Sequence, residues 1–289
     1  MSTVAEAIAR YLCSGEYEHD HAEWSGNSWW ERAKNGHDDL LRALVAEVKK
    51  RSKGRQHHAV PDLDLTSWTR RKLTPMVQGL FPQVEREAVL ALLERSVVFL
   101  TADNIEKVLL EQHWLRSAWD IANLYLGSVG ADLLGPEAPS LVGLSQETTC
   151  YVSAEYFKPS KGIADYVIHE SAHVFHNCKR KTAGLTETRT KEWLLLLEFR
   201  KRETFAYSCE AYGAILERAK DRAARLALAE KFAKQVESYG DDEIEPAELA
   251  SIVREACEAR NGWKVILSRC APEKRVRQKV TALTSAIGE

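Results

Sequence analysis

The chain has 289 residues, of which 45% are hydrophobic and 28% are charged, and its formal net charge at pH 7 is −2. These values are typical of a globular protein with a substantial core, and the near-neutral charge argues against a nucleic-acid binder that depends on bulk charge. No apolar run is long enough to cross a bilayer. We therefore expect its partners to include neither nucleic acid nor a membrane.

The six cysteines are widely spaced and form no Cys-x-x-Cys pair. This pattern is typical of reduced thiols, and not of a disulfide framework or a cysteine zinc site. The first residues also lack the basic and apolar regions of a secretory signal. The sequence therefore predicts a cytoplasmic protein.

Residues 1–80 are predicted to form a helical N-terminal segment. Apolar residues recur with helical spacing in the ranges 1–14 and 36–52. Pro61 and the alternating leucines that follow it favour an extended link, so the segment ends at a soft boundary between residues 60 and 80.

Residues 81–289 are predicted to form the main domain, which we expect to be α+β and mostly helical, with a small sheet and a C-terminal helical lobe. Strand signals occur in the ranges 96–100 and 140–157, and Ser160 is placed to cap the helix that follows them. Helical spacing of apolar residues predicts the other elements at 83–95, 102–127, 191–212, 216–226, 246–260 and 273–287.

A short stretch after the expected sheet carries the clearest chemical signal. It reads Tyr166-Val-Ile-His169-Glu170-Ser-Ala-His173-Val-Phe-His176. Residues four apart lie on one face of a helix, so His169 and His173 can each present a ring nitrogen to one metal ion. Glu170 lies about 100° further round, where it can reach a water on that metal. The apolar neighbours indicate a buried helix, in which charge is costly unless it is paired or bound to metal.

Hydrolytic zinc sites have three protein ligands and one open position, so a third ligand must come from elsewhere in the chain. The predicted helix at 191–212 contains no proline, and Glu203, Tyr207 and Glu210 fall on one of its faces. This face is the first place to look for the missing ligand.

The sequence Glu203-Thr-Phe-Ala, together with the histidine motif, resembles the zincin metallopeptidases and specifically their gluzincin branch. In that branch the third ligand is a Glu on a later helix, often in a Glu-x-Phe-Ala setting. The resemblance implies a zincin-like catalytic domain in which His169, His173 and Glu203 bind Zn²⁺. It also implies that Glu170 is the catalytic base.

Other third ligands remain open. Glu210 is the next candidate, followed by Glu198 on the same predicted helix. Peptide deformylases carry the same histidine motif with a cysteine as third ligand, and Cys150 lies upstream of the motif. The start of the chain has no glycine-rich deformylase motif, and a buried strand cysteine is the alternative interpretation of Cys150.

Further residues near the motif have expected roles. A second donor must stabilise the oxyanion, and Tyr207 is favoured over His176 for this role. The other interpretations of His176 are a cleft wall, a group that orients a metal ligand, a substrate contact, or a core or surface histidine. Asp165 is expected either to orient a metal ligand or to place a favourable negative charge at the N-terminus of the motif helix. The range 149–153 resembles the zincin edge strand that pairs with an extended substrate.

We therefore expect a zinc metallopeptidase that hydrolyses an intracellular protein or peptide, with Glu170 as general base on a zinc-activated water. Two other hypotheses remain: a non-catalytic helical interaction protein with a degenerate motif, and a deformylase-like zinc amidohydrolase. Loss of zinc on substitution of Glu203 would support the metallopeptidase hypothesis. Loss of zinc on substitution of Cys150 would support the deformylase-like amidohydrolase.

Overall fold

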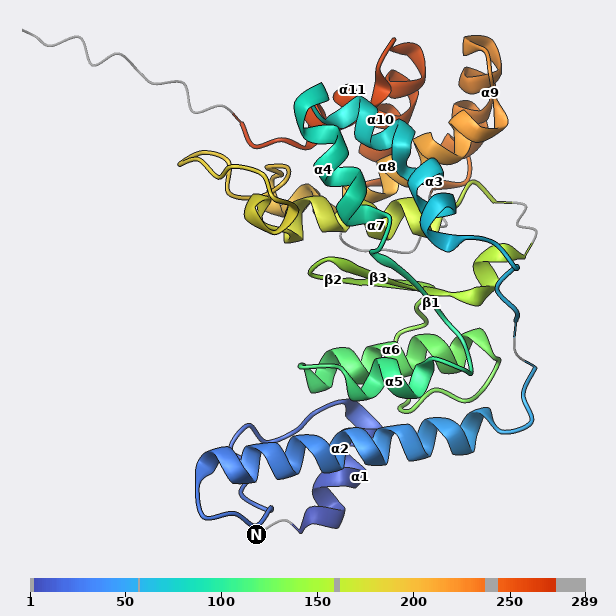
Figure 1. Ribbon diagram of the computed structural model, residues 1–289. Coiled ribbons are helices and arrows are strands. Elements are labelled where there is room, and N and C mark those ends of the chain that lie inside the picture. Colours follow the sequence, from blue (N-terminus) through green and yellow to red (C-terminus); the bar gives the residue numbers. More distant parts are fainter. Residues whose placement is uncertain (1–2, 57, 159–161, 237–243, 274–289) are drawn as a thin grey trace, which may run out of the picture.

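The computed structural model describes residues 3–56, 58–158, 162–236 and 244–273. It is mostly helical with one small sheet, which confirms the predicted α+β class. The sheet is a thin middle layer with helices on both of its faces (Figure 1). Below it in that view lie α1 (Val4–Ser14), α2 (Trp29–Ser52), α5 (Ile105–Leu110) and α6 (Leu115–Ser128). Above it lie α3 (Leu65–Leu80), α4 (Gln83–Leu93), α7 (Tyr166–Asn177), α8 (Arg202–Arg218), α9 (Arg222–Ala233), α10 (Pro246–Glu258) and α11 (Gly262–Cys270).

The sheet has the strand order β1-β3-β2, with strands β1 (Val97–Leu100), β2 (Gly143–Gln146) and β3 (Thr149–Ser153). β3 is the central strand, parallel to β1 and antiparallel to β2. The prediction that 149–153 is the edge strand is therefore wrong. The edge strand on the side of the cleft is β2, and its outer side is here called the open edge. Because Ser153 N donates to Val142 O, the alternation of an antiparallel pair turns the peptide groups of Gly143 and Ser145 toward that open edge.

Two hydrophobic cores lie on the two faces of the sheet. Successive residues of β3 point to opposite faces, so Cys150 and Val152 join the core around α7 while Tyr151 joins the core around α6. Leu73 of α3 lies in the α7 core. The other core combines α1 and α2 with α5 and α6, which come later in the chain. Each core therefore combines residues from before and after residue 80.

Two predicted elements in the first half of the chain differ from the structure. α3 occupies the region of the expected extended link, and its first turn is capped by the side chain of Asp64. The helix predicted at 102–127 is interrupted between α5 and α6. At this interruption the side-chain amide of Gln112 donates to the hydroxyl of Tyr151 at 2.9 Å, so the break ties the lower helices to the sheet.

The first part of the helix predicted at 191–212 is not helical. The N–H groups of Leu194 and Leu195 donate to the carbonyls of Cys178 and Phe175, at the end of α7. Backbone groups used in this way cannot form an intrahelical ladder. The regular helix α8 therefore begins only at Arg202.

The start of α7 also differs from the prediction. Asp165 caps this helix, and its side chain accepts from the N–H of Ile168 at 3.2 Å. Ser160, the predicted cap, lies outside the described residues, as does the part of the segment predicted at 273–287 that follows Glu273. None of the helices in the described ranges combines the length and the apolar character needed to span a bilayer.

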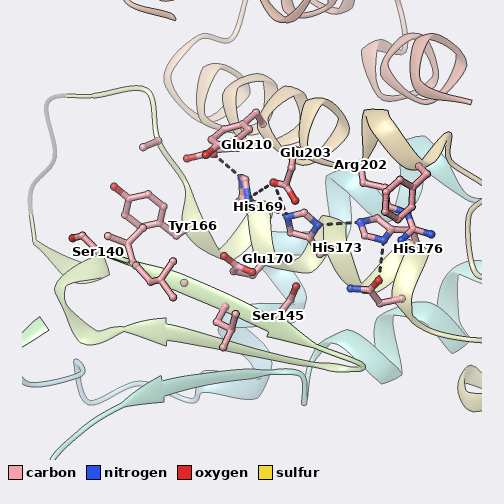
Figure 2. Close-up of a pocket in the computed structure, with 18 of the residues that line it drawn as sticks. Ser140, Ser145, Tyr166, His169, Glu170, His173, His176, Arg202, Glu203 and Glu210 are labelled. Carbon is pink, nitrogen blue, oxygen red and sulfur yellow. Dashed lines mark hydrogen bonds and ion pairs between the residues drawn. The ribbon is translucent and has the colours of Figure 1, made fainter. Parts of the chain in front are cut away.

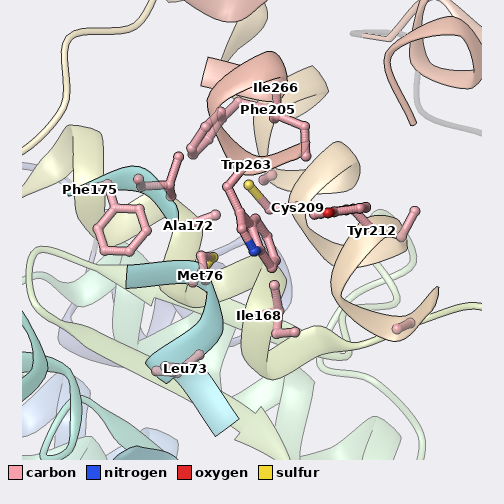
Figure 3. Packing of buried hydrophobic residues seen from close by; sticks show 14 of the residues in the cluster. Leu73, Met76, Ile168, Ala172, Phe175, Phe205, Cys209, Tyr212, Trp263 and Ile266 are labelled. Atoms are coloured by element: carbon pink, nitrogen blue, oxygen red, sulfur yellow. The ribbon is translucent and has the colours of Figure 1, made fainter. Parts of the chain in front are cut away.

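α3 and α11 are in close contact at Gly79 and Trp263. A Cβ on Gly79 would lie 2.2 Å from Cδ1 and 2.7 Å from Cβ of Trp263. The Gly79 carbonyl also accepts from the side-chain amide of Asn261 at 3.0 Å. Trp263 in turn belongs to the core that contains Met76 and Ile168 (Figure 3). The absence of a side chain at position 79 therefore lets α11 pack against the layer that holds α7.

We expect Gly79→Ala to destabilise the protein by about 1–3 kcal/mol, because the added methyl group displaces a buried indole. Chemical denaturation monitored by circular dichroism measures this change. Gly127→Ala in α6 is the matched control, because the nearest atom to a Cβ there is 3.7 Å away and alanine favours a helix. Equal stability of the two variants would contradict the close contact of α3 with α11.

Candidate metal centre

α7 and α8 bring two histidines and one carboxylate together. His169 and His173 lie one turn apart on α7, and Glu203 lies in the first turn of α8. The Nε2 atoms of the two rings are 3.1 Å apart. Oε2 of Glu203 lies 3.7 Å from Nε2 of His169 and 3.4 Å from Nε2 of His173. Figure 2 shows these side chains, here called the triad, converging near Glu170. Among the described residues, the triad is the group of side chains that could hold a metal ion.

The triad fits a tetrahedral zinc ion. Bonds of about 2.0–2.1 Å at tetrahedral angles place neighbouring donor atoms about 3.3–3.4 Å apart. The measured separations of 3.1, 3.4 and 3.7 Å lie on both sides of this value. Two imidazole nitrogens and a carboxylate oxygen are also ligands that zinc accepts, with a fourth position left for a reactant.

Glu210 lies behind His169 and is not part of the triad. Its Oε2 is 3.0 Å from Nδ1 of His169, so Nδ1 donates this hydrogen bond and Nε2 is the ring nitrogen left to bind a metal. Its Oε1 accepts from the backbone N–H of Asp165 at 2.9 Å. Both oxygens of this buried carboxylate thus accept hydrogen bonds. Glu210, the second candidate for the third ligand, therefore orients His169 instead of joining the triad.

A chain of hydrogen bonds orients His173 in the same way. Nδ1 of His173 lies 2.9 Å from Nε2 of His176, and Nδ1 of His176 lies 3.0 Å from the side-chain oxygen of Asn177. Because an amide oxygen only accepts, His176 donates to Asn177 and accepts from His173. Burial, with His173 and Arg202 nearby, lowers the pKa of His176 to about 3, which keeps the ring neutral. Nε2 of His173 therefore presents its lone pair to the triad.

Carboxylates set the electrostatic field at the triad. Burial lowers the pKa of His169, but the hydrogen bond and charge of Glu210, with the charges of Glu170 and Glu203, raise it to about 9 overall. Burial also opposes ionisation of Glu203, yet its hydrogen bond with His173 and the nearby rings hold the pKa of that carboxyl below its ordinary value. The surrounding side chains therefore favour positive charge at this point.

A buried ion pair supports the start of α7. Lys72 of α3 contacts the carboxylate of Asp165 and lies 2.5 Å from that of Glu217. Burial raises the pKa of Asp165, and Lys72 opposes this shift. The expected orienting role of Asp165 is indirect, because its backbone N–H holds Glu210, which in turn holds His169.

Glu170 lies beside the triad and against β2. Burial raises its pKa, whereas the charges of His169 and His173 and a hydrogen bond with Ser145 oppose this shift. A Cβ on Gly143 would lie 2.8 Å from Cγ and 3.0 Å from Cδ of Glu170. β2 can therefore approach the carboxylate this closely because residue 143 has no side chain.

The triad and Glu170 open into a cleft of about 1070 Å³. Its walls come from residues 140–145, from α7 and from residues 199–210. Tyr207, the predicted oxyanion donor, lines the cleft and packs edge-on against His169 with ring centroids 4.5 Å apart. Tyr212, on the same helix, packs against Trp263 in the core.

The remaining candidates for the third ligand lie elsewhere. Cys150 is buried in β3, where burial raises the pKa of its thiol, and it is not in the metal-ligating group of the described residues. Glu198 is exposed immediately before the 3-10 turn that leads into α8.

Sequence reasoning missed three residues that support the site: Gly143, Asn177 and Lys72. Asn177 directly follows His176, so its role had a local signal. Gly143 and Lys72 are remote from the motif in sequence, and their roles depend on how β2 and α3 pack against α7.

Comparison of the chain with protein-family models, curated proteins and solved structures gave no match. Its function must therefore be inferred from the triad, Glu170 and the cleft.

We expect Glu210→Gln to weaken zinc binding by about 10- to 100-fold, because His169 loses the carboxylate that fixes its tautomer. Competition with a chromophoric chelator measures the affinity. Glu198→Gln, which changes an exposed carboxylate outside the cleft lining, should bind zinc as the wild type does. The orienting role fails if the two variants have the same affinity.

Proposed function

We propose that this protein is a zinc-dependent metallopeptidase that hydrolyses peptide bonds in a protein or peptide. The observation that carries this proposal is the convergence of His169, His173 and Glu203 at near-tetrahedral separations, with Glu170 beside them in an open cleft. Hydrolytic zinc sites need three ligands, one open position and a nearby base. The arrangement also agrees with the gluzincin-like assignment that the motifs suggest.

Glu170 is the general base in this proposal. When bound, zinc supplies Lewis-acid activation of water and of the scissile carbonyl. Glu170 accepts a proton from the attacking water and delivers it to the leaving amine. Burial raises the pKa of Glu170 above its ordinary value, which suits a carboxyl group that must both take and return a proton. Tyr207, edge-on to His169, donates its hydroxyl to the oxyanion.

The open edge of β2 supports a peptide substrate. The peptide groups of Gly143 and Ser145 point toward this edge, and both residues line the cleft. An extended substrate can add to such an edge as a further strand, with main-chain hydrogen bonds that do not depend on its sequence. The substrate then passes beside Glu170, which touches Gly143.

Other observations bear on the compartment and on the alternatives. All six cysteines are free thiols, which supports the proposed cytoplasmic location. The deformylase-like alternative loses support because Cys150 does not join the triad. A non-catalytic interaction protein needs neither bound zinc nor Glu170, so a single variant separates it from a peptidase.

Glu170→Gln should retain about one zinc per chain and lose peptide cleavage by about 100-fold or more, because the amide cannot accept the proton. Elemental analysis measures the metal, and mass spectrometry of a digested peptide library measures cleavage. His173→Ala is the matched variant and should lose both zinc and cleavage. A Glu170→Gln protein that cleaves the library as the wild type does would exclude this mechanism.

Gly143→Ala tests the contact between β2 and the proposed base. The new methyl group should displace Glu170 and lower kcat by about 10-fold or more, with zinc content unchanged, since small misplacements of catalytic groups are costly. Steady-state kinetics on a peptide cleaved by the wild type gives kcat and KM. Gly127→Ala is the control, and equal kcat in the two variants would show that Gly143 does not position Glu170.

A further inference from the structure

The two ends of the cleft differ in chemistry. Figure 2 shows Ser140 and Tyr166 at the end near the start of α7, and His176 and Arg202 at the end near its C-terminus. Arg200 also lines the cleft. The guanidinium of Arg202 therefore lies on one side of the triad.

Within the part of the chain that the structure describes, no carboxylate pairs with Arg202. Its guanidinium lies over the ring of Phe199, 4.9 Å from the centroid, and the side chain is half-buried. Its Nε is buried and meets no hydrogen-bond acceptor in the described ranges. By contrast, Arg180, which is fully buried, is paired with Glu85. A guanidinium that is partly removed from water favours a carboxylate, which can accept two of its hydrogen bonds.

His176 does not supply the positive charge at this end. Its two ring nitrogens are engaged by His173 and Asn177. Outside the triad, the cations of the cleft lining are thus Arg200 and Arg202, and Arg202 is the one fixed by stacking on Phe199.

The charges of the lining favour an anionic substrate once a metal is bound. The cleft is lined by three carboxylates, those of Glu170, Glu203 and Glu210, and by the two arginines. A divalent cation in the triad makes the sum positive by one charge. Because the carboxylates lie around the triad and Arg202 lies beyond it, this excess is greatest at the Arg202 end.

We propose that Arg202 binds a carboxylate of the substrate and makes the cleft selective for peptides with an acidic group on the side of the triad nearer the C-terminus of α7. This inference deepens the proposed peptidase function and rests on it. The carboxylate comes either from an Asp or Glu side chain or from the C-terminus of the peptide. Arg200, which also lines the cleft, adds long-range attraction.

Calorimetric titration of zinc-loaded Glu170→Gln protein tests the inference, because this variant is expected to bind peptides without cleaving them, so that the heat measures binding alone. One set of probes is short peptides, blocked at both ends, with a single Glu or Gln moved along an otherwise neutral sequence. The second set has no acidic side chain and carries either a free or an amidated C-terminus. Arg202→Gln is compared with Arg71→Gln, which changes an exposed arginine of α3 outside the cleft lining.

We expect the acidic member of a pair to bind about 10- to 100-fold more tightly, as for a charge-assisted pair of hydrogen bonds. This ratio should disappear in Arg202→Gln, fall partly in Arg202→Lys and persist in Arg71→Gln. The probe set that shows the effect identifies the source of the carboxylate. Zinc content and thermal stability of each variant show that it is folded.

A ratio unchanged by Arg202→Gln, or no binding of any probe, would overturn the inference. Cleavage of the same peptides by the wild-type protein is scored separately. Arg202-dependent binding without cleavage would remove the peptidase proposal and leave the carboxylate site. Cleavage without a preference for acidic peptides would leave the peptidase proposal and remove the carboxylate site.

Discussion

The close approach of α8 to α7 is the constraint on which the site depends. At Gly213 the two helices pack directly against each other, and a Cβ there would lie 2.3 Å from Cδ1 of Ile168, the residue before His169. Glu210 and Glu203 lie on the same face of α8, toward its N-terminus. One stripe of α8 therefore provides the close contact, the carboxylate behind His169 and the third donor of the triad.

This packing buries charges that would be costly if they were alone, since an unpaired buried ion costs several kcal/mol. Each charge instead has a partner: Lys72 pairs with Asp165, the backbone N–H of Asp165 holds Glu210, and Glu210 holds His169. Displacing one member leaves another buried group unsatisfied. The network thus resists rotation of the His169 ring, so the direction of its Nε2 is fixed by groups from three helices.

The sequence was sufficient for the local part of the site and insufficient for the tertiary part. The spacing of His169 and His173 predicts a shared face because both lie on one helix. Glu203 and Glu210 also share a face, and only the position of α8 along α7 decides that the first joins the triad while the second orients His169. The edge strand could not be identified for a similar reason. β2 and β3 are both short, and which of them pairs with β1 depends on the long connection through α5 and α6.

The lower helices affect the cleft through the sheet. The amide of Gln112, at the end of α5, holds the hydroxyl of Tyr151 in β3, and Leu100 and Tyr151 lie in the core that includes α2 and α6. β3 is therefore fixed from below by this core and from above by the core around α7. β2 is bonded to β3 and has no free space against Glu170 at Gly143. A shift of the lower core would thus reach the proposed base through β3 and then β2.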